Sequence, residues 1–287
     1  MSLRINSNVS AMNAYRNLSV SDTAMSSSLE KLSSGLRINK AADDAAGLSI
    51  SDGLESQIGG LTVAVRNAQD GINVVQTADG ALSESTAILQ RMRDLAVQAS
   101  NTGSQDPNAQ AAANTEVTQL KAELDRIANT TAFGGKQLLD GTYKGQFQVG
   151  ANNNVNDQIT VDLSATNTTL FGTGSPVTGF DSTKLGVASV DLTTAPQAAI
   201  DSIDAAIKGV STARATMGAY QNRFQHTVNN LNVAVENLTA SDSQIRDVDM
   251  ASEMTNFTKN QILVQAGTAM LAQANQTPQN VLSLLKG

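Results

Sequence analysis

Few residues in this chain have the side chains that catalysis or metal binding requires. The 287 residues include one histidine, His226, and no cysteine. A zinc site of the HExxH type, a thiolate nucleophile and a triad with a histidine base are therefore excluded or unsupported. His226 comes two positions after Phe224, which belongs to a regular apolar row, so we interpret it as part of a solvated helix face. We predict no catalytic residue.

Two pairs of nearby acids are the remaining candidates for a metal site. Asp43 and Asp44, like Asp247 and Asp249, carry carboxylates that could chelate a divalent cation. More often, such pairs are helix caps or solvated charges of a linker. We therefore predict caps or solvated charges at these positions, with no metal and no cofactor.

Composition indicates long helices rather than one thick core. Aromatic residues make up 3% of the chain and tryptophan is absent, which suits helices that share thin apolar seams. The net charge of -7 argues against a nucleic-acid partner. The N-terminal sequence lacks the apolar run of a secretory signal, and no apolar stretch approaches the roughly twenty residues of a membrane span. The absence of cysteine fits an exported protein, which we expect to use another export route.

The two ends of the chain carry matching apolar patterns. Large apolar residues recur at every seventh position in residues 1–36 and again in Met250–Gly287, which predicts two coiled-coil helices. Their apolar side chains are too few to offset the entropy lost on ordering either segment alone. We therefore expect the two helices to pair with each other and with other copies of the chain. We call this expected pair of terminal helices the inner core. The residues assigned to its contacts are Leu18, Met25, Leu29, Leu32, Leu36, Met254, Phe257, Val264, Leu271, Leu282 and Leu285.

Longer heptad rows lie between these ends. One row predicts a helix over 54–99, a shorter pattern predicts an antiparallel return over 110–128, and the most regular row covers 197–239. The predicted core of this helical rod is Leu54, Leu61, Val75, Leu82, Leu89, Ile203, Val210, Met217, Phe224, Leu231 and Leu238. Between the helices, Gln146–Val149 and Gln158–Leu163 flank the turn sequence GANNNVND and predict a hairpin, with weak strand signals at Val187–Leu192.

These patterns predict a mainly α fold. It consists of a long antiparallel helical rod or coiled-coil bundle with a small β-hairpin region and paired terminal helices. The predicted divisions are 1–43 for the N-terminal part of the inner core, 44–132 for the N-terminal part of the rod, 133–196 for the β-containing region, 197–239 for the C-terminal part of the rod, and 240–287 for a linker and the C-terminal part of the inner core.

Three functional hypotheses follow from the patterns. The first is a structural protein that polymerises with identical copies of itself. The second is a coiled-coil signalling module, which would need a membrane span or sensor domain that the sequence does not show. The third is an enzyme in the middle region, but Phe133–Pro196 contains neither histidine nor cysteine.

Several long motifs resemble bacterial flagellin. The resemblance covers about residues 1–165 and 197–287. The motifs are MSLRINSNVSAMNAYRNL at the start, LEKLSSGLRINKAADDAAGLSIS from Leu29, RNAQDGINVVQTADGAL from Arg66, LQRMRDLAVQ from Leu89, ELDRIANTTAFGGKQLLDG from Glu123, FQVGANNN from Phe147 and ILVQAGTAMLAQANQTPQNVLSLL from Ile262.

The resemblance implies a non-enzymatic subunit of the extracellular flagellar filament, secreted for motility, with a hook-filament junction protein as the alternative. The implied partners are other copies of the chain, an export chaperone that sequesters the C-terminal helix, the flagellar type III export apparatus, and the filament cap and hook-junction proteins. The central region is short compared with larger flagellins, so we expect a thin, smooth filament.

The resemblance also implies contacts with innate immune flagellin receptors. The alternative interpretation is that these residues serve packing between subunits. The matching positions are Gln90, Arg91, Leu95 and Glu116 for the cell-surface receptor, and Leu282, Leu284 and Leu285 for the cytosolic sensors.

Overall fold

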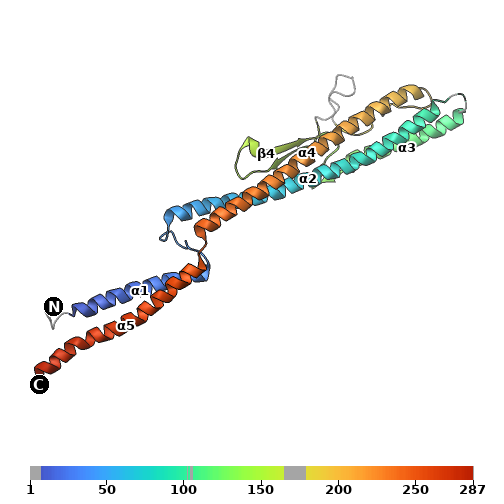
Figure 1. The fold of residues 1–287 in the computed structure, drawn as a ribbon. Coiled ribbons are helices and arrows are strands. Elements are labelled where there is room, and N and C mark those ends of the chain that lie inside the picture. Colours follow the sequence, from blue (N-terminus) through green and yellow to red (C-terminus); the bar gives the residue numbers. More distant parts are fainter. Residues whose placement is uncertain (1–7, 102, 104–105, 165–178, 287) are drawn as a thin grey trace. The chain divides into compact units, whose positions relative to one another are not determined.

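A computed structural model describes residues 8–101, 103, 106–164 and 179–286, and the side chains only as far as residue 276 at the C-terminal end. The chain forms two compact units. Unit 1 contains Met1–Ser56 and Asn237–Gly287, and unit 2 contains Gln57–Glu236. Most of the chain is helical and the strands form small antiparallel hairpins, which confirms the predicted mainly α fold (Figure 1).

The described elements are five long helices, four short strands and one turn of 3-10 helix. The helices are α1 (Val9–Ser34), α2 (Ala45–Ala99), α3 (Pro107–Thr130), α4 (Pro196–Arg246) and α5 (Met250–Lys286). The strands are β1 (Ala132–Phe133), β2 (Lys136–Gln137), β3 (Lys144–Gln148) and β4 (Gln158–Asp162), with the 3-10 turn at Val155–Asp157.

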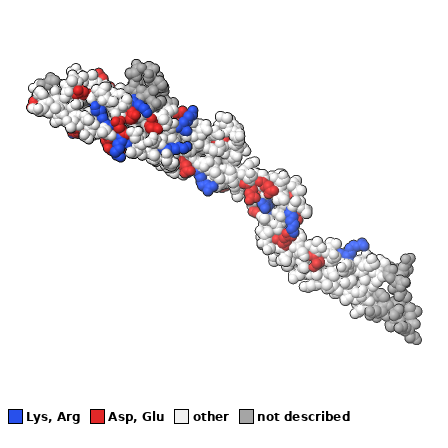
Figure 2. Space-filling view, turned by 180° about the vertical axis from the view of Figure 1, so that it is seen from behind, with Lys and Arg blue, Asp and Glu red and all other residues white. Residues whose placement is uncertain are grey.

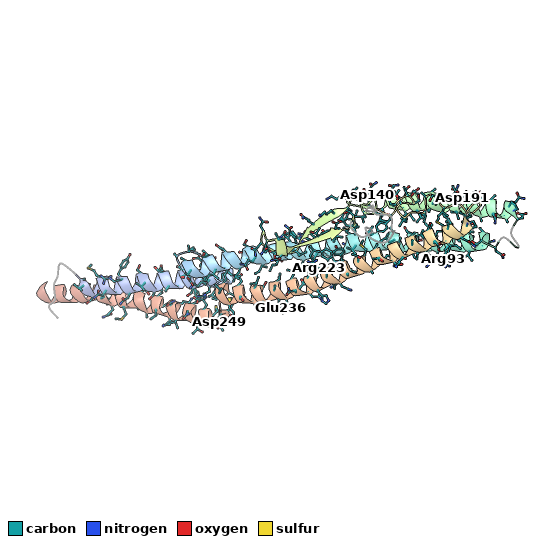
Figure 3. The ribbon with its side chains drawn as sticks, turned by 90° about the horizontal axis from the view of Figure 1, so that it is seen from above. Arg93, Asp140, Asp191, Arg223, Glu236 and Asp249 are labelled. Atoms are coloured by element: carbon teal, nitrogen blue, oxygen red, sulfur yellow. The ribbon has the colours of Figure 1, made fainter. Side chains whose placement is uncertain are left out.

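In unit 2, α2 and α4 run side by side in opposite directions. Asp79 of α2 pairs with Arg214 of α4 over 2.9 Å, and Arg93, farther along α2, pairs with Asp204, which comes earlier in α4 (Figure 3). As the residue number increases along α2, the residue number of the partner in α4 decreases, so the two helices are antiparallel. Helix α3 runs back along α2 (Figure 1). Near the connection between the two helices, the Gln110 side-chain amide donates to the carbonyl of Ala99.

The apolar rows of α2 and α4 form the core of unit 2. Most of the predicted rod residues are buried there, whereas Leu54, Leu61 and Leu238 are half-buried. The buried members are Val75, Leu82, Leu89, Ile203, Val210, Met217, Phe224 and Leu231.

The predicted hairpin is confirmed and packs on this core. Strands β3 and β4 pair antiparallel, with Lys144 opposite Asp162 and Gln148 opposite Gln158. Phe147 points from β3 onto Phe224 of α4, and the two ring centroids lie 5.4 Å apart at an interplanar angle of 85°. This edge-to-face contact fixes the hairpin against the helices.

The weak strand signals at Val187–Leu192 are wrong. This segment consists of turns, and its backbone groups bond to side chains of α3 instead of a neighbouring strand. The ammonium group of Lys121 donates to the carbonyls of Ala188 and Val190, and the Asn114 side chain accepts from the Leu192 N–H. These bonds replace the ladder that the strand pattern implied.

Residues 240–249, at the start of the segment predicted to begin with a linker, are mostly helical. The first of these residues include neither glycine nor proline, so α4 continues to Arg246 and only three residues separate it from α5. The compact units divide at 56/57 and 236/237. The cause is that the first turns of α2 pack with the end of α4: the buried Ser51 hydroxyl donates to Asp242, and Arg246 pairs with Glu55.

Candidate interaction surface

Helices α1 and α5 begin at polar caps. The Asn8 side chain accepts from the N–H of Ala11 at the start of α1. At the start of α5, the Asp249 carboxylate accepts from the N–H groups of Ala251 and Ser252 (Figure 3). Each cap satisfies donors that have no partner within the helix. The predicted capping role of Asp249 is confirmed.

The other acids of the candidate metal pairs are also engaged locally. Asp44 accepts from the N–H of Gly47 and so caps α2, as predicted. Asp43 accepts from the N–H groups of Lys40 and Asn39, which lower its pKa below the ordinary value. Asp247 accepts from the Ser243 hydroxyl. Among the described residues, no three potential ligands lie close enough to hold a metal ion.

Helices α1 and α5 pair in opposite directions within unit 1 (Figure 1). At one end, the Asn8 side-chain amide donates to the carbonyl of Ala274 over 2.7 Å. At the other end, the N–H of Val248 donates to the carbonyl of Gly35, and Leu36 and Asp247 form an antiparallel bridge. The predicted pairing of the terminal helices is therefore confirmed.

The seam between the two helices is thin. Ser28 is the buried residue of α1, and no residue of α5 from Met250 to Gln276 is buried. Gly267 of α5 lies so close to Leu18 that a β-carbon there would be 3.2 Å from the Leu18 Cδ1. The half-buried apolar residues of the seam are Leu18, Met25, Leu32, Phe257, Val264 and Leu271.

Many large apolar side chains of these helices point away from the seam. Tyr15 and Met270 are 65% and 64% exposed. Figure 2 shows one face on which charged side chains are sparse over α1 and α5, and the sequence has no charged residue from Asn260 to Leu285. The other exposed members are Val9, Met12, Val20, Leu29, Met250, Met254, Ile262 and Leu263.

Two grooves flank the seam, one along each side of α1. The Tyr15 groove has a volume of about 680 Å³ and the Met270 groove about 330 Å³. The Tyr15 groove is lined by Ala11, Met12, Tyr15, Arg16, Ser19, Val20, Leu271 and Asn275. The Met270 groove is lined by Ser10, Ala14, Asn17, Leu18, Ser21, Leu263, Ala266, Gly267 and Met270. Successive residues of a helix are rotated by about 100° around its axis. On this basis, the α1 residues that line the Tyr15 groove and those that line the Met270 groove point in opposite directions.

The heptad analysis missed several residues of this surface. Leu29 and Met254 were predicted and are exposed, but Met12, Val20 and Ile262 were not in the predicted set. A count in sevens selects the residues that face the partner helix. For Ile262 the signal is the absence of charged residues from Asn260 to Leu285, because the outer face of an ordinary solvated helix carries charge.

A further cleft in unit 2, of about 440 Å³, lies beside the β3–β4 turn. Its charged lining residues are Asp157 and Arg223, and Figure 3 labels Arg223. The cleft holds no nucleophile paired with a base, which catalysis of the triad type requires. His226 is exposed on α4. None of the described helices combines the length and apolar character needed to cross a membrane.

The residues matched to receptor recognition divide between surface and core. Gln90 and Arg91 are exposed, and the Arg91 guanidinium pairs with the Glu116 carboxylate over 2.7 Å. Leu95 is 3% exposed and lies in the core of unit 2. The side chains of Leu282, Leu284 and Leu285 lie outside the described residues.

Comparison with known proteins gives consistent matches at both ends of the chain. Residues 5–144 match the bacterial flagellin N-terminal helical region, and residues 200–285 match the bacterial flagellin C-terminal helical region. The chain is 49% identical to a flagellin of Bacillus subtilis, over 99% of this chain and 100% of that protein. It is 51% identical to a flagellin of Halalkalibacterium halodurans, over 98% of this chain and 99% of that protein.

A solved structure shares the fold at lower identity. A putative flagellar hook-associated protein of Vibrio parahaemolyticus has a TM-score of 0.58 and 14% sequence identity, over 71% of this chain and 100% of that chain.

Proposed function

Because the chain belongs to the bacterial flagellin family and is a structural, non-enzymatic subunit of the flagellar filament, we propose that α1 and α5 form the surface through which identical subunits join. The observation that carries the proposal is the paired helices' large set of exposed apolar residues, such as Tyr15, Ile262 and Met270. Contiguous apolar surface of this kind marks a protein interface.

The two grooves make the two sides of this surface different from each other. Because the Tyr15 groove and the Met270 groove flank the seam on opposite sides, a subunit offers different surfaces to its two neighbours. A contact between two different surfaces does not close on itself as a twofold dimer does. Repetition of such a contact produces a ring or a helical polymer, which fits a filament subunit.

The hook-filament junction protein is the alternative in the same structural class. Its support is the likeness to a hook-associated protein, which at 14% identity concerns the fold alone. The identity near 50% to flagellins over almost the entire chain favours the filament subunit. Electron microscopy after addition of filament seeds separates the two, because a filament subunit gives long polymers and a junction protein gives short rings.

Limited proteolysis with a protease of broad specificity tests the assembly surface. We expect the free subunit to lose α1 and α5 first while unit 2 survives, because the terminal seam buries few side chains. The same segments should resist digestion in seeded filaments. Equal resistance of α5 and unit 2 in the free subunit would contradict the proposal.

We propose further that α5 binds an export chaperone before assembly. A chaperone that covers Ile262, Leu263 and Met270 would keep this apolar surface from premature self-association. The flagellar type III apparatus would then deliver the subunit to the extracellular filament, where the cap and hook-junction proteins contact it. The test is co-purification with the chaperone: Ile262→Asp should lose it, and Val155→Asp, on the β3–β4 turn, should retain it.

The surface residues Gln90, Arg91 and Glu116 are proposed to contact the innate immune flagellin receptor. The Arg91–Glu116 ion pair is exposed and presents both charges on unit 2. Arg91→Ala should weaken receptor binding more than Arg93→Ala, whose guanidinium pairs with Asp204 of α4. Equal effects of the two substitutions would overturn the assignment.

A further inference from the structure

The described methionines divide sharply between the two units. Met92 and Met217 of unit 2 are both 0% exposed. In unit 1, Met12 and Met270 are 61% and 64% exposed, and Met250 and Met254 are 49% exposed each; Met25 is half-buried in the seam. Hydrogen peroxide in solution can therefore reach the thioethers of the terminal helices and not those of the helical core.

We propose that these four exposed methionines are oxidation sites, and that their oxidation in the free subunit prevents its addition to a filament. The inference rests on the proposed function, because it requires α1 and α5 to form the assembly surface. In the reaction, a sulfur lone pair attacks one oxygen of hydrogen peroxide and the O–O bond breaks. The second oxygen leaves as hydroxide and takes the proton of the transferred oxygen, so the sulfur, oxidised by two electrons, becomes a sulfoxide and the other product is water.

The positions of the methionines explain why oxidation stops assembly. Met12 lines the Tyr15 groove and Met270 lines the Met270 groove, so each flank of the seam carries an oxidisable thioether. A sulfoxide is polar, and its oxygen loses hydrogen bonds to water when another subunit covers it. Met250 and Met254 lie on the first turns of α5, where their oxidation would add polar sulfoxides to the same surface.

Assembly protects the same sulfurs. Once neighbouring subunits cover α1 and α5, hydrogen peroxide no longer reaches the thioethers, so the filament is resistant and the free subunit is sensitive. Because oxidised subunits cannot join a filament, only undamaged subunits are incorporated. Methionine sulfoxide reductases reverse the oxidation. Two enzymes are needed, one for each sulfoxide epimer.

The first experiment maps oxidation by peptide mass spectrometry. Free subunits and seeded filaments of the full chain are exposed to hydrogen peroxide for increasing times. In the free subunit, Met12, Met250, Met254 and Met270 should oxidise about ten-fold or more faster than the buried Met92, which is an internal control. In filaments the four rates should fall to the Met92 level. Equal rates for the four methionines in subunit and filament would overturn the proposal.

The second experiment measures seeded elongation by oxidised subunits. The rate should fall about ten-fold or more relative to untreated subunits, and treatment with both reductases should restore it. The variant with all four methionines replaced by leucine should change its own rate less than about two-fold on peroxide treatment. Met92→Leu is the matched control and should keep the full loss.

The outcomes separate this inference from the proposed function. Oxidised subunits that elongate seeds as fast as untreated subunits overturn the inference alone. Untreated subunits that elongate no seed overturn the proposed assembly function. A loss of elongation that the reductases do not restore also counts against oxidation of methionine as its cause.

Discussion

Gly71 of α2 lies directly against the ring of Phe224 of α4. A β-carbon built at Gly71 would be 2.6 Å from the Phe224 Cζ and 2.8 Å from its Cε1. Phe224 is 0% exposed, and the edge-to-face contact with Phe147 leaves its ring little room to move away. The absence of a side chain at position 71 is therefore what allows α2 and α4 to enclose this ring.

This contact predicts opposite effects of alanine at two glycines of the same helix. Gly71→Ala forces the Phe224 ring to move and should lower the free energy of unfolding by about 1–3 kcal/mol. Gly80→Ala meets nothing within 4 Å and should raise it by up to about 1 kcal/mol, because alanine favours the helix. Urea unfolding of the monomer, followed by circular dichroism, measures both changes. Stabilisation by both substitutions would show that the ring contact is not close.

Lys121 should hold the turn segment that replaces the expected strand. Its ammonium group donates to the carbonyls of Ala188 and Val190. Lys121→Met removes these charge-assisted bonds and should lower the free energy of unfolding by about 1–3 kcal/mol. Hydrogen exchange should quicken at the amides of residues 185–192, whereas Lys136→Met, on β2, should leave them unchanged. Unaltered exchange in Lys121→Met would refute the role of the ammonium group.

Asp191 should make part of the stability of unit 2 depend on pH. The hydroxyl and the backbone N–H of Thr193 donate to this carboxylate and hold its pKa below the ordinary value (Figure 3). Because the folded state lowers the pKa, the contribution is present above the ordinary pKa and is lost as the pH falls through the lower folded value. Asp191→Asn should therefore be less stable than the native chain at pH 7, and the difference should shrink in acid.

The titration itself can be checked by NMR of the Asp191 carboxyl group. Thr193→Val removes the hydroxyl donor and should raise the pKa of Asp191 towards its ordinary value. If the pKa is the same in both proteins, the Thr193 hydroxyl is not the cause of the shift.

Ile262 should be needed for assembly and not for the fold of the free subunit. It is 59% exposed on α5, so Ile262→Asp removes little packing in the monomer. Burial of the new carboxylate between subunits costs several kcal/mol, and seeded elongation should fall about ten-fold or more. Val155→Asp is the control, because Val155 is 85% exposed in unit 2; its elongation rate should change less than about two-fold. Equal losses in the two variants would contradict the assembly surface.

The helical part of the fold is readable from the sequence because its cause is periodic. Ile203, Val210 and Met217 recur every seventh residue, and each is buried in unit 2 because one stripe of α4 faces the core. The β3–β4 hairpin was also predictable, since turn-forming residues separate two short runs of strand formers. Both signals depend only on neighbouring residues.

The features that the sequence did not predict depend on distant partners. Val187–Leu192 has the composition of a strand, but Lys121 and Asn114 of α3 satisfy its backbone instead. In the interaction surface, the heptad count found the seam at Leu18 and Val264. It missed Ile262, which is exposed on the outer face of α5 and so lies outside the row that faces the partner helix.

Unit 1 is built from both extremes of the polypeptide, with all of unit 2 between them. The backbone bonds that join Gly35 to Val248 and Arg37 to Arg246 cannot form until the final fifth of the molecule is available. During synthesis, α1 therefore stays unpaired until the residues that form α5 have been added. A product cut short before Met250 is left with an unmatched N-terminal helix.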